Sequence, residues 1–193
     1  MLKLFDVMFD LETLSTQPDA VVMSFAAVAF DRERRYTWEE IQHLDQMTCK
    51  IDINSQVGRH IDGSTLHWWM RQSPEAQAGV IPLPGHHPIQ LRRALLNFRE
   101  WYKNVRGGVT WSHGAAFDHA IIDSAYAYVG IENPIHYKDR LCMRTVTHLT
   151  QCQRPDVQST THDALEDCRF QILWLQDALR KWQPNVPLPA VQP

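Results

Sequence analysis

The chain has 193 residues, 44% of them hydrophobic and 21% charged, and its formal net charge is -3. This length predicts one domain over residues 1–182 that buries enough surface to fold without disulfides. The charge excludes a basic protein that binds nucleic acid mainly by counterion release, but not an enzyme that contacts a few phosphates. Because no apolar run approaches the ~20 residues that span a bilayer and the N-terminal segment meets an acid early, we expect no membrane association and a cytoplasmic location.

The cysteines are scattered along the chain, at positions Cys49, Cys142, Cys152 and Cys168. None of them forms a C-x-x-C pair, so neither a zinc knuckle nor a thioredoxin-like site is indicated. We expect buried thiols in a reducing compartment.

The first quarter of the chain shows strand patterns. Residues 4–12 alternate between two faces, as a strand requires. After a turn at Pro18, residues 20–30 form a nearly continuous apolar run, which predicts a hairpin with the first strand. A third short strand at 47–53 would complete an antiparallel meander.

Helical spacing dominates the rest of the chain. We expect a strand at 109–112 and four helices, whose apolar stripes are Leu66, Trp69, Met70 and Ser73; Leu91, Leu95, Phe98 and Tyr102 after Pro88; Phe117, Ile121, Ala125 and Tyr128; and Leu165, Cys168, Ile172, Leu175, Leu179 and Trp182. Residues 183–193 contain four prolines and predict an extended or disordered tail. The order of elements predicts an α/β fold with a mixed sheet covered by helices.

Two acids stand at the end of the first predicted strand. Asp10 and Glu12 are two residues apart, so both side chains leave the same face and can share a hard divalent cation. The alternative is a pair of solvated acids at a strand end. Asp6 shares their face but lies roughly 13 Å upstream, too far to bind the same ion.

A third acid follows the strand at 109–112 and a glycine turn. Asp118 falls in the first turn of the next helix, where it is a candidate metal ligand or simply favours the helix dipole. Asp123 is more than one turn further along the helix and would point elsewhere.

The last motif begins the final long helix. Thr160 with Asp163, or Asp163 with Glu166, can form a capping pair. On a regular helix His162 and Asp167 would point about 140° apart. They converge on one site only if His162 stands in the non-helical segment before the helix; otherwise it is an exposed histidine.

The order of these motifs, D-x-E, then a mid-chain Asp, then H-x-A-x-x-D, resembles the DEDDh family of 3′-to-5′ exonucleases. The resemblance extends over about residues 4 to 180 and implies a ribonuclease H-like fold, an antiparallel meander followed by parallel strands. Its four acids and histidine correspond to Asp10, Glu12, Asp118, Asp167 and His162.

Three stretches, residues 6–13, 65–72 and 112–118, are similar to a small phage and bacterial branch of that family. The branch includes a phage-type exodeoxyribonuclease and a mycobacterial-type exoribonuclease, and it implies a homodimer. His113 replaces the usual Asn of the branch's Trp-x-Asn-Gly turn.

The resemblance implies a metal-dependent exonuclease that releases 5′-mononucleotides from DNA or RNA with a free 3′ end. Two Mg²⁺ or Mn²⁺ ions would be held by the four acids, with Asp10 as the bridging ligand. His162, whose unperturbed pKa is near 6.5, is suited to act as the general base.

Substrate contacts are expected around these groups. Trp68 and Gln72 lie at i and i+4, away from the apolar stripe of their predicted helix, so Trp68 could stack on a base or instead be partly buried. Trp111 could stack or belong to the core, and Arg140 could clamp a phosphate as Arg144 could. The remaining candidates are Leu11, Thr13, His113 and Phe117.

Two other functions compete with the exonuclease. One is a nucleic-acid-binding or assembly module that has lost activity, against which the intact set of five site residues argues. The other is a nucleotide-hydrolysing or endonuclease variant of the same fold, which end-labelled oligonucleotides would distinguish.

Overall fold

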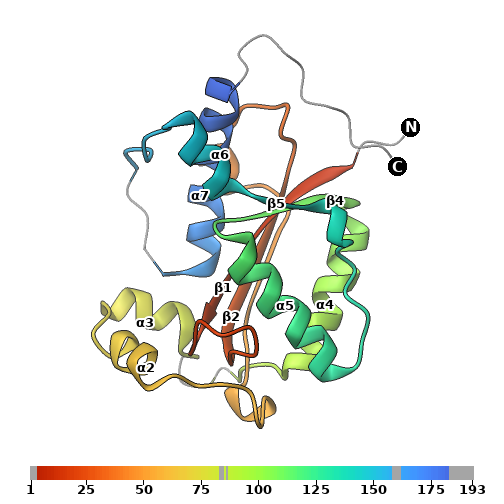
Figure 1. Ribbon diagram of the computed structural model, residues 1–193, viewed down its shortest axis with the longest axis vertical. Helices are drawn as coiled ribbons and strands as arrows, with labels where there is room; N and C mark the ends of the chain where they lie inside the picture. Colours follow the sequence, from red (N-terminus) through yellow and green to blue (C-terminus); the bar gives the residue numbers. More distant parts are fainter. Residues whose placement is uncertain (1–3, 83–84, 86, 158–161, 183–193) are drawn as a thin grey trace.

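The computed structural model describes residues 4–82, 85, 87–157 and 162–182 and contains a five-stranded sheet in the order β3-β2-β1-β4-β5 (Figure 1). Its strands are β1 Phe5–Thr13, β2 Val22–Phe30, β3 Gln46–Lys50, β4 Gly107–Ser112 and β5 Arg140–Cys142. The first three strands pair antiparallel, whereas β4 is parallel to β1 and β5 is parallel to β4. The predicted mixed sheet is confirmed.

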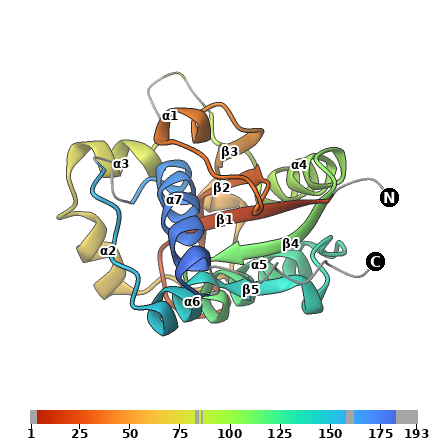
Figure 2. The same ribbon diagram turned by 90° about the horizontal axis from the view of Figure 1, so that it is seen from above.

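Helices cover both faces of this sheet. They are α1 Trp38–Ile41, α2 Gly63–Trp69, α3 Pro74–Val80, α4 Leu91–Asn104, α5 Ala115–Val129, α6 Met143–Thr150 and α7 Ala164–Trp182, with short 3-10 turns at Ile53–Ser55 and Tyr137–Asp139. In Figures 1 and 2, α4 and α5 lie on one side of the strands and α7 lies on the other. No helix in the described ranges is long and apolar enough to cross a membrane.

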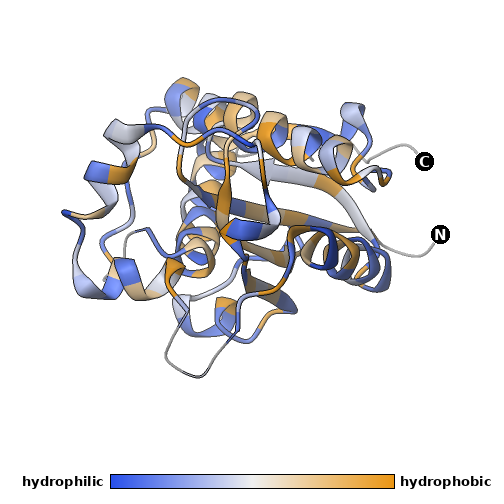
Figure 3. Cartoon of the chain, turned by 90° about the horizontal axis from the view of Figure 1, so that it is seen from below, coloured by the Kyte–Doolittle hydropathy of each residue, from blue (hydrophilic) through white to orange (hydrophobic). Residues whose placement is uncertain are grey.

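Alternate residues of β1 contribute to two cores. Val7 and Phe9 pack with apolar side chains of α4 and α5, whereas Met8 packs with Ile172 and Leu175 of α7. A sheet that is buried on both faces explains why β2 is a continuous apolar run rather than an alternating one. Figure 3 shows the hydrophobic positions along the strands and the mixed polarity of the helices.

The predicted helix with Leu66, Trp69, Met70 and Ser73 on one stripe is wrong in its second half. Helix α2 ends at Trp69, and the Ser73 side chain caps the separate helix α3 by accepting the amide of Ala76. A serine followed by proline favours a new helix start, because proline fits the first helical turn. Of the three apolar stripe residues only Trp69 is buried, while Leu66 and Met70 are exposed.

Several short elements gave no periodic signal in the sequence. Strand β5 has three residues, too few for an alternation to be detected, and α6 has eight.

All four cysteines are free, but only Cys152 and Cys168 are buried; Cys49 and Cys142 are partly exposed, which corrects the expectation of four buried thiols. The predicted tail at 183–193 lies outside the described residues.

Candidate active site

The C-terminal end of β1 carries the first two acids. Asp10 and Glu12 lie on the face of β1 that also presents Met8 to the core beneath α7. Glu12 is 8% exposed, so it is not a solvated acid at a strand end. The register with β2 shifts immediately after Glu12, at Thr13, where the regular pairing ends. The strand thus presents two carboxylates to one edge of the α7 face.

Asp118 reaches the same region from the other side of the sheet. Strand β4 is parallel to β1, so the two strands end at the same edge, and Gly114 turns the chain into α5 with φ of 134°. The Asp118 carboxylate is buried and accepts hydrogen bonds from the Ser112 side chain and the Leu11 amide. These contacts hold the carboxylate against β1, which a solvated first-turn acid would not require.

The start of α7 supplies the histidine and the fourth acid. Asp163 caps the helix, because its Oδ1 accepts the amides of Leu165 and Glu166 at 3.0 and 3.1 Å. His162 precedes the cap in a left-handed conformation, with φ of 64°, and its amide donates to Asp167 Oδ2 at 3.1 Å. His162 therefore stands in the non-helical segment that convergence with Asp167 requires. The alternative cap at Thr160 lies outside the described residues.

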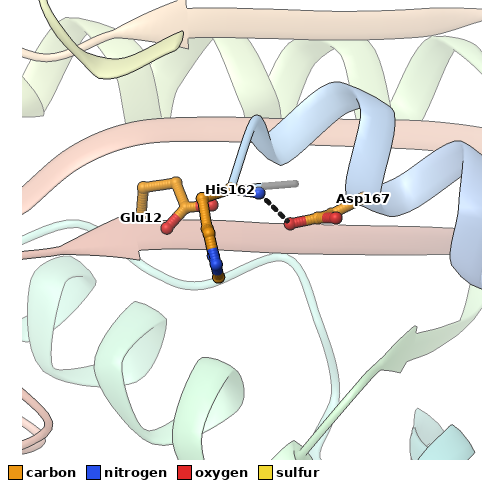
Figure 4. Close-up of side chains that lie close together, drawn as sticks. All are labelled: Glu12, His162 and Asp167. Carbon is orange, nitrogen blue, oxygen red and sulfur yellow. Dashed lines mark hydrogen bonds between the residues drawn. The ribbon is translucent and has the colours of Figure 1, made fainter. Parts of the chain in front are cut away.

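Three of these groups meet closely enough to hold one metal ion. Ligand atoms of Glu12, His162 and Asp167 lie within 4.8 Å of one another (Figure 4). Asp10 is close enough to Asp118, Glu12 and Asp167 for their charges to raise its pKa. The three separate segments of the sequence thus form one acidic cluster.

The cluster is electrostatically strained without a cation. Burial raises the pKa of Asp10 well above its ordinary value, that of Glu12 to about 8, that of Asp118 to about 7 and that of Asp167 to about 6. Charges of neighbouring carboxylates add to the effect of burial at Asp10, Glu12 and Asp167. Such a set of hard oxygen donors suits divalent Mg²⁺ or Mn²⁺, whose positive charge would remove the repulsion.

Gln171 is a site residue that the sequence reasoning missed. It is 6% exposed, and its Nε2 donates to Asp10 Oδ1 at 2.9 Å. Its Oε1 is buried and has no partner in the described part of the chain. An unpaired buried oxygen beside four carboxylates fits a site in which the amide accepts a hydrogen bond from metal-bound water. The signal was its position four residues after Asp167, on the same face of α7.

A cavity of about 710 Å³ opens beside Glu12, lined among others by Leu11, Thr13, Trp68 and Phe117. The Trp68 side chain is 41% exposed, and its ring stands edge-on to the His162 ring, with centroids 4.7 Å apart. Trp68 thus faces the cleft, as its position off the apolar stripe suggests. These four predicted substrate contacts share one hollow next to the acids.

Two predicted substrate contacts are corrected by the structure, and a third does not line the cavity beside Glu12. Trp111 is 3% exposed and its Nε1 donates to Asp6 Oδ2 at 2.7 Å, so its indole belongs to the core. Gln72 follows the end of α2 and does not line this cavity; its Nε2 donates to the Trp68 carbonyl, and its contact with substrate stays a prediction. Arg140 makes a bidentate ion pair with Asp123 and is not free to clamp a phosphate.

Of the other two candidates, His113 lies where β4 passes into α5, and Arg144 of α6 contacts that turn. The exposed Arg144 side chain donates from Nη2 to the His113 carbonyl at 2.8 Å, and its charge lowers the pKa of Asp118. The His113 ring centroid is 5.4 Å from that of Trp174, and burial lowers the pKa of His113. Asp6 makes an ion pair with Arg32 at 3.1 Å, remote from the cluster as its spacing predicts.

The family model of the 3′-5′ exoribonuclease Rv2179c-like domain matches residues 5–179. The chain belongs to this family. Over 92% of its length this Rv2179c-like domain is also 26% identical to the exodeoxyribonuclease of Enterobacteria phage T4, of which the match covers 90%.

Solved structures show the same fold at low sequence identity. Exonuclease I of E. coli, in its zinc-bound complex with single-stranded DNA, superposes with a TM-score of 0.64 at 12% identity, over 95% of this chain and 42% of that one. The nuclease domain of 3′hExo, a DEDDh family member bound to rAMP, superposes with a TM-score of 0.57 at 12% identity, over 90% and 92% of the two chains. The Rv2179c-like domain spans less than half of exonuclease I.

These likenesses and the order of the site residues identify a 3′-5′ exonuclease of the DEDDh type on a ribonuclease H-like fold. The exonuclease I complex contains a zinc ion, and the cluster of Glu12, His162 and Asp167 could hold a metal ion in this chain. The predicted family, fold class and enzyme class are confirmed.

Proposed function

We propose that the protein hydrolyses single-stranded DNA or RNA, or a 3′ overhang, from its free 3′ end to 5′-mononucleotides with two Mg²⁺ or Mn²⁺ ions. The observation that carries this proposal is the convergence of Glu12, His162 and Asp167 within 4.8 Å beside Asp10 and Asp118. It joins a metal-binding set of acids to a histidine that can accept a proton.

The four carboxylates would hold the ions. Asp10, whose pKa is raised by the charges of the other three acids, would hold the ions together with Glu12, Asp118 and Asp167. When bound, such a pair of ions activates the attacking water and stabilises the charge on the leaving 3′ oxygen. Gln171 holds the Asp10 carboxylate in one orientation through its 2.9 Å hydrogen bond.

His162 is the general base that takes the proton of the attacking water. Burial and the charge of Arg154 lower its pKa below the ordinary 6.5, so its ring is neutral at pH 7 and has a free nitrogen lone pair. The edge of Trp68 against the ring and the capped start of α7 restrict where the imidazole can lie. The base is thereby positioned before substrate binds.

The cavity beside Glu12 receives the terminal nucleotide. Its volume of about 710 Å³ falls in the range of ordinary small-molecule sites, ≈ 300–1,000 Å³. Trp68 and Phe117 would contact the base, and the backbone around Leu11 and Thr13 would approach the terminal 3′ hydroxyl. The indole of Trp69 supports this wall by donating to the Thr13 carbonyl at 2.9 Å.

The proposal includes both DNA and RNA because the two sequence matches are named for different substrates. The matching family is described as exoribonuclease, whereas the phage T4 relative is an exodeoxyribonuclease. A homodimer and a single domain over residues 1–182 stay predictions.

The test uses matched single-stranded DNA, RNA and 3′-overhang duplexes, labelled at either end, with and without Mn²⁺. We expect a ladder of shortened 5′-labelled products and release of mononucleotide from the 3′-labelled strand, only with metal. Internal fragments would favour the endonuclease alternative, and binding without shortening on any substrate would favour the inactive module.

A further inference from the structure

A second cavity, of about 680 Å³, lies between residues 152–155 and the C-terminal half of α7. Its lining includes four cationic side chains, Arg32, Arg154, Arg180 and Lys181. We refer to it as the basic cavity. It shares no lining residue with the cavity beside Glu12.

The positive charge of the basic cavity is only partly neutralised. Arg32 is paired with Asp6, and Asp177, the one acid of the lining, is paired with Arg35 at 3.3 Å. Within the described ranges no ion pair involves Arg154, Arg180 or Lys181. The residues outside those ranges include no Asp or Glu. Three cations are therefore available to an anionic ligand.

Arg154 connects the basic cavity to the active site. Its guanidinium lies 4.7 Å from the centroid of the Phe170 ring on α7, so an aromatic face rather than a carboxylate holds it. Phe170 lies three residues after Asp167 on α7, and the charge of Arg154 acts to lower the pKa values of His162 and Asp167, so Arg154 is within electrostatic range of the proposed general base. The segment that carries it is attached to α7, because Trp174 Nε1 donates to the Cys152 carbonyl at 3.0 Å.

Helix α7 runs from the active site to the basic cavity. Asp167 stands in the first turn of α7, and Arg180 and Lys181 stand in its last turn, about 20 Å further along the helix axis. The helix packs against β1 and β2 (Figure 1). It covers the face of β1 that carries Met8, Asp10 and Glu12. A single-stranded nucleic acid whose 3′ end enters the active site can therefore follow α7 past Arg154 to the basic cavity without crossing the β-sheet.

We propose that the basic cavity binds phosphates of the single strand on the 5′ side of the scissile bond, with Arg154 contacting the phosphate nearest the metals. This inference rests on the proposed function, since it assigns a path to the same substrate. A positive groove that follows the backbone is how proteins hold single strands without reading their sequence. Charged hydrogen bonds from guanidinium groups suit phosphodiester oxygens.

The test compares the double variant Arg180→Ala/Lys181→Ala with Arg93→Ala/Lys103→Ala, which removes the same charge from exposed positions of α4 on the other face of the sheet. The substrates are a 5′-phosphorylated dinucleotide, which carries one phosphate on the 5′ side of the scissile bond, and a 12-nucleotide single strand, both of the sugar type that the unmodified protein cleaves. We expect the first variant to raise KM for the 12-mer roughly tenfold, with kcat and the dinucleotide KM unchanged. The α4 variant should leave both substrates unaffected.

Salt dependence gives a second readout. Two lost phosphate contacts should reduce the slope of log KM against log salt for the 12-mer by about 1.4, since each contact to a single strand contributes about 0.7. Arg154→Ala should instead raise KM for both substrates, because it contacts the first phosphate. If the α7 and α4 variants changed KM equally, or if the change did not depend on substrate length, the proposed role of the basic cavity would be wrong. The proposed exonuclease activity would not be affected by that result. Absence of cleavage by the unmodified protein would overturn the proposed function itself.

Discussion

Two acids of the site, Asp10 and Asp118, are held by contacts that their own segments of sequence do not supply. Asp10 on β1 accepts a hydrogen bond from Gln171 on α7, and Asp118 on α5 accepts one from the Leu11 amide on β1. The carboxylates are thereby oriented before metal or substrate binds, which reduces the cost of assembling the site.

Replacing His162 by alanine tests the general base. We expect His162→Ala to lower single-turnover rates about 10²–10⁴-fold while divalent metal still binds, because the acids remain. In the unmodified protein at saturating metal, the rate should fall on acidification only below pH 6.5, since protonation removes the base and its pKa is lowered. His148→Ala, at an exposed position of α6, is the control. An unchanged rate in His162→Ala would show that another group accepts the proton.

Gln171 offers a test of the contact to Asp10. Gln171→Leu should raise the metal concentration for half-maximal activity by about 10–100-fold, because the ligand loses the partner that orients it. Gln176→Leu is a matched control on the same helix, since Gln176 is buried but pairs with the backbone of Tyr36. We expect that control to lower the free energy of unfolding without changing metal affinity. If Gln171→Leu left the metal affinity unchanged and Gln176→Leu weakened it, a role for Gln171 in the metal site would be excluded.

Trp111 tests the distinction between a core residue and a base-stacking one. Trp111→Phe removes the donor to Asp6 Oδ2 and should lower the free energy of unfolding by about 1–3 kcal/mol, with KM unchanged. Phe117→Leu, within the cavity beside Glu12, should raise KM instead. Denaturant unfolding and steady-state kinetics measure the two effects. A raised KM with unchanged stability in Trp111→Phe would restore its stacking role.

At the scale of elements, the junction between β4 and α5 decides where Asp118 lies. Gly114 adopts φ of 134°, a conformation that side chains rarely tolerate, and a Cβ there would approach Arg144 Nη2 to 3.3 Å. Thr110 of β4 and His119 of α5 are joined at 3.0 Å, which fixes the helix to the strand just beyond this turn. The turn and the bond together set the position of the first turn of α5.

Gly114→Ala should therefore affect both stability and activity. We expect the free energy of unfolding to fall by about 1–3 kcal/mol because of backbone strain. The metal concentration for half-maximal activity should rise, because the Asp118 carboxylate shifts. Gly63→Ala is the control, since nothing lies within 4 Å of a Cβ at that position and its φ is not in the left-handed region. Similar behaviour of the two variants in thermal unfolding and metal titration would contradict this role.

At the scale of the whole molecule, the formal charge of -3 is concentrated in the site. Without the four site acids the balance is +1, and two divalent ions neutralise the same four charges. The metal-free protein should consequently bind nucleic acid weakly, and the metal-loaded protein should expose its basic cavity to the strand without opposing acidic charge nearby.

The same cluster predicts how stability depends on pH and metal. Because the folded pKa values of Glu12, Asp118 and Asp167 are raised to about 8, 7 and 6, the folded protein binds more protons than the unfolded chain between about pH 4 and 8. The free energy of unfolding of metal-free protein should fall as pH rises through this window. Mg²⁺ or Mn²⁺ at 100 times its Kd should restore about 2.7 kcal/mol at pH 8.

Thermal unfolding of metal-free protein at pH 5.5, 7 and 8, with and without added metal, measures this effect. Asp118→Asn should weaken both the pH dependence and the stabilisation by metal, because one buried charge is removed. A stability that rises with pH in this window and does not respond to metal would contradict the clustering of the acids.

The sequence by itself determined the main strands and the long helices, and with the family resemblance it predicted the five polar residues that the structure brings together. Their signals are local: β1 alternates with period two, α7 repeats with helical spacing, and Asp163 provides a cap that places His162 before the helix. Only the tertiary structure decided which polar and aromatic side chains face the site. Trp111 and Trp68 look equally suited to stack on a base, yet one pairs with Asp6 in the core and the other contacts His162 at the cleft. Gln171 and Arg154 likewise acquire their roles from packing. The spacing of Gln171 from Asp167 indicates a shared helix face, but its bond to Asp10 and the contact of Arg154 with Phe170 join segments distant in the sequence and leave no local pattern.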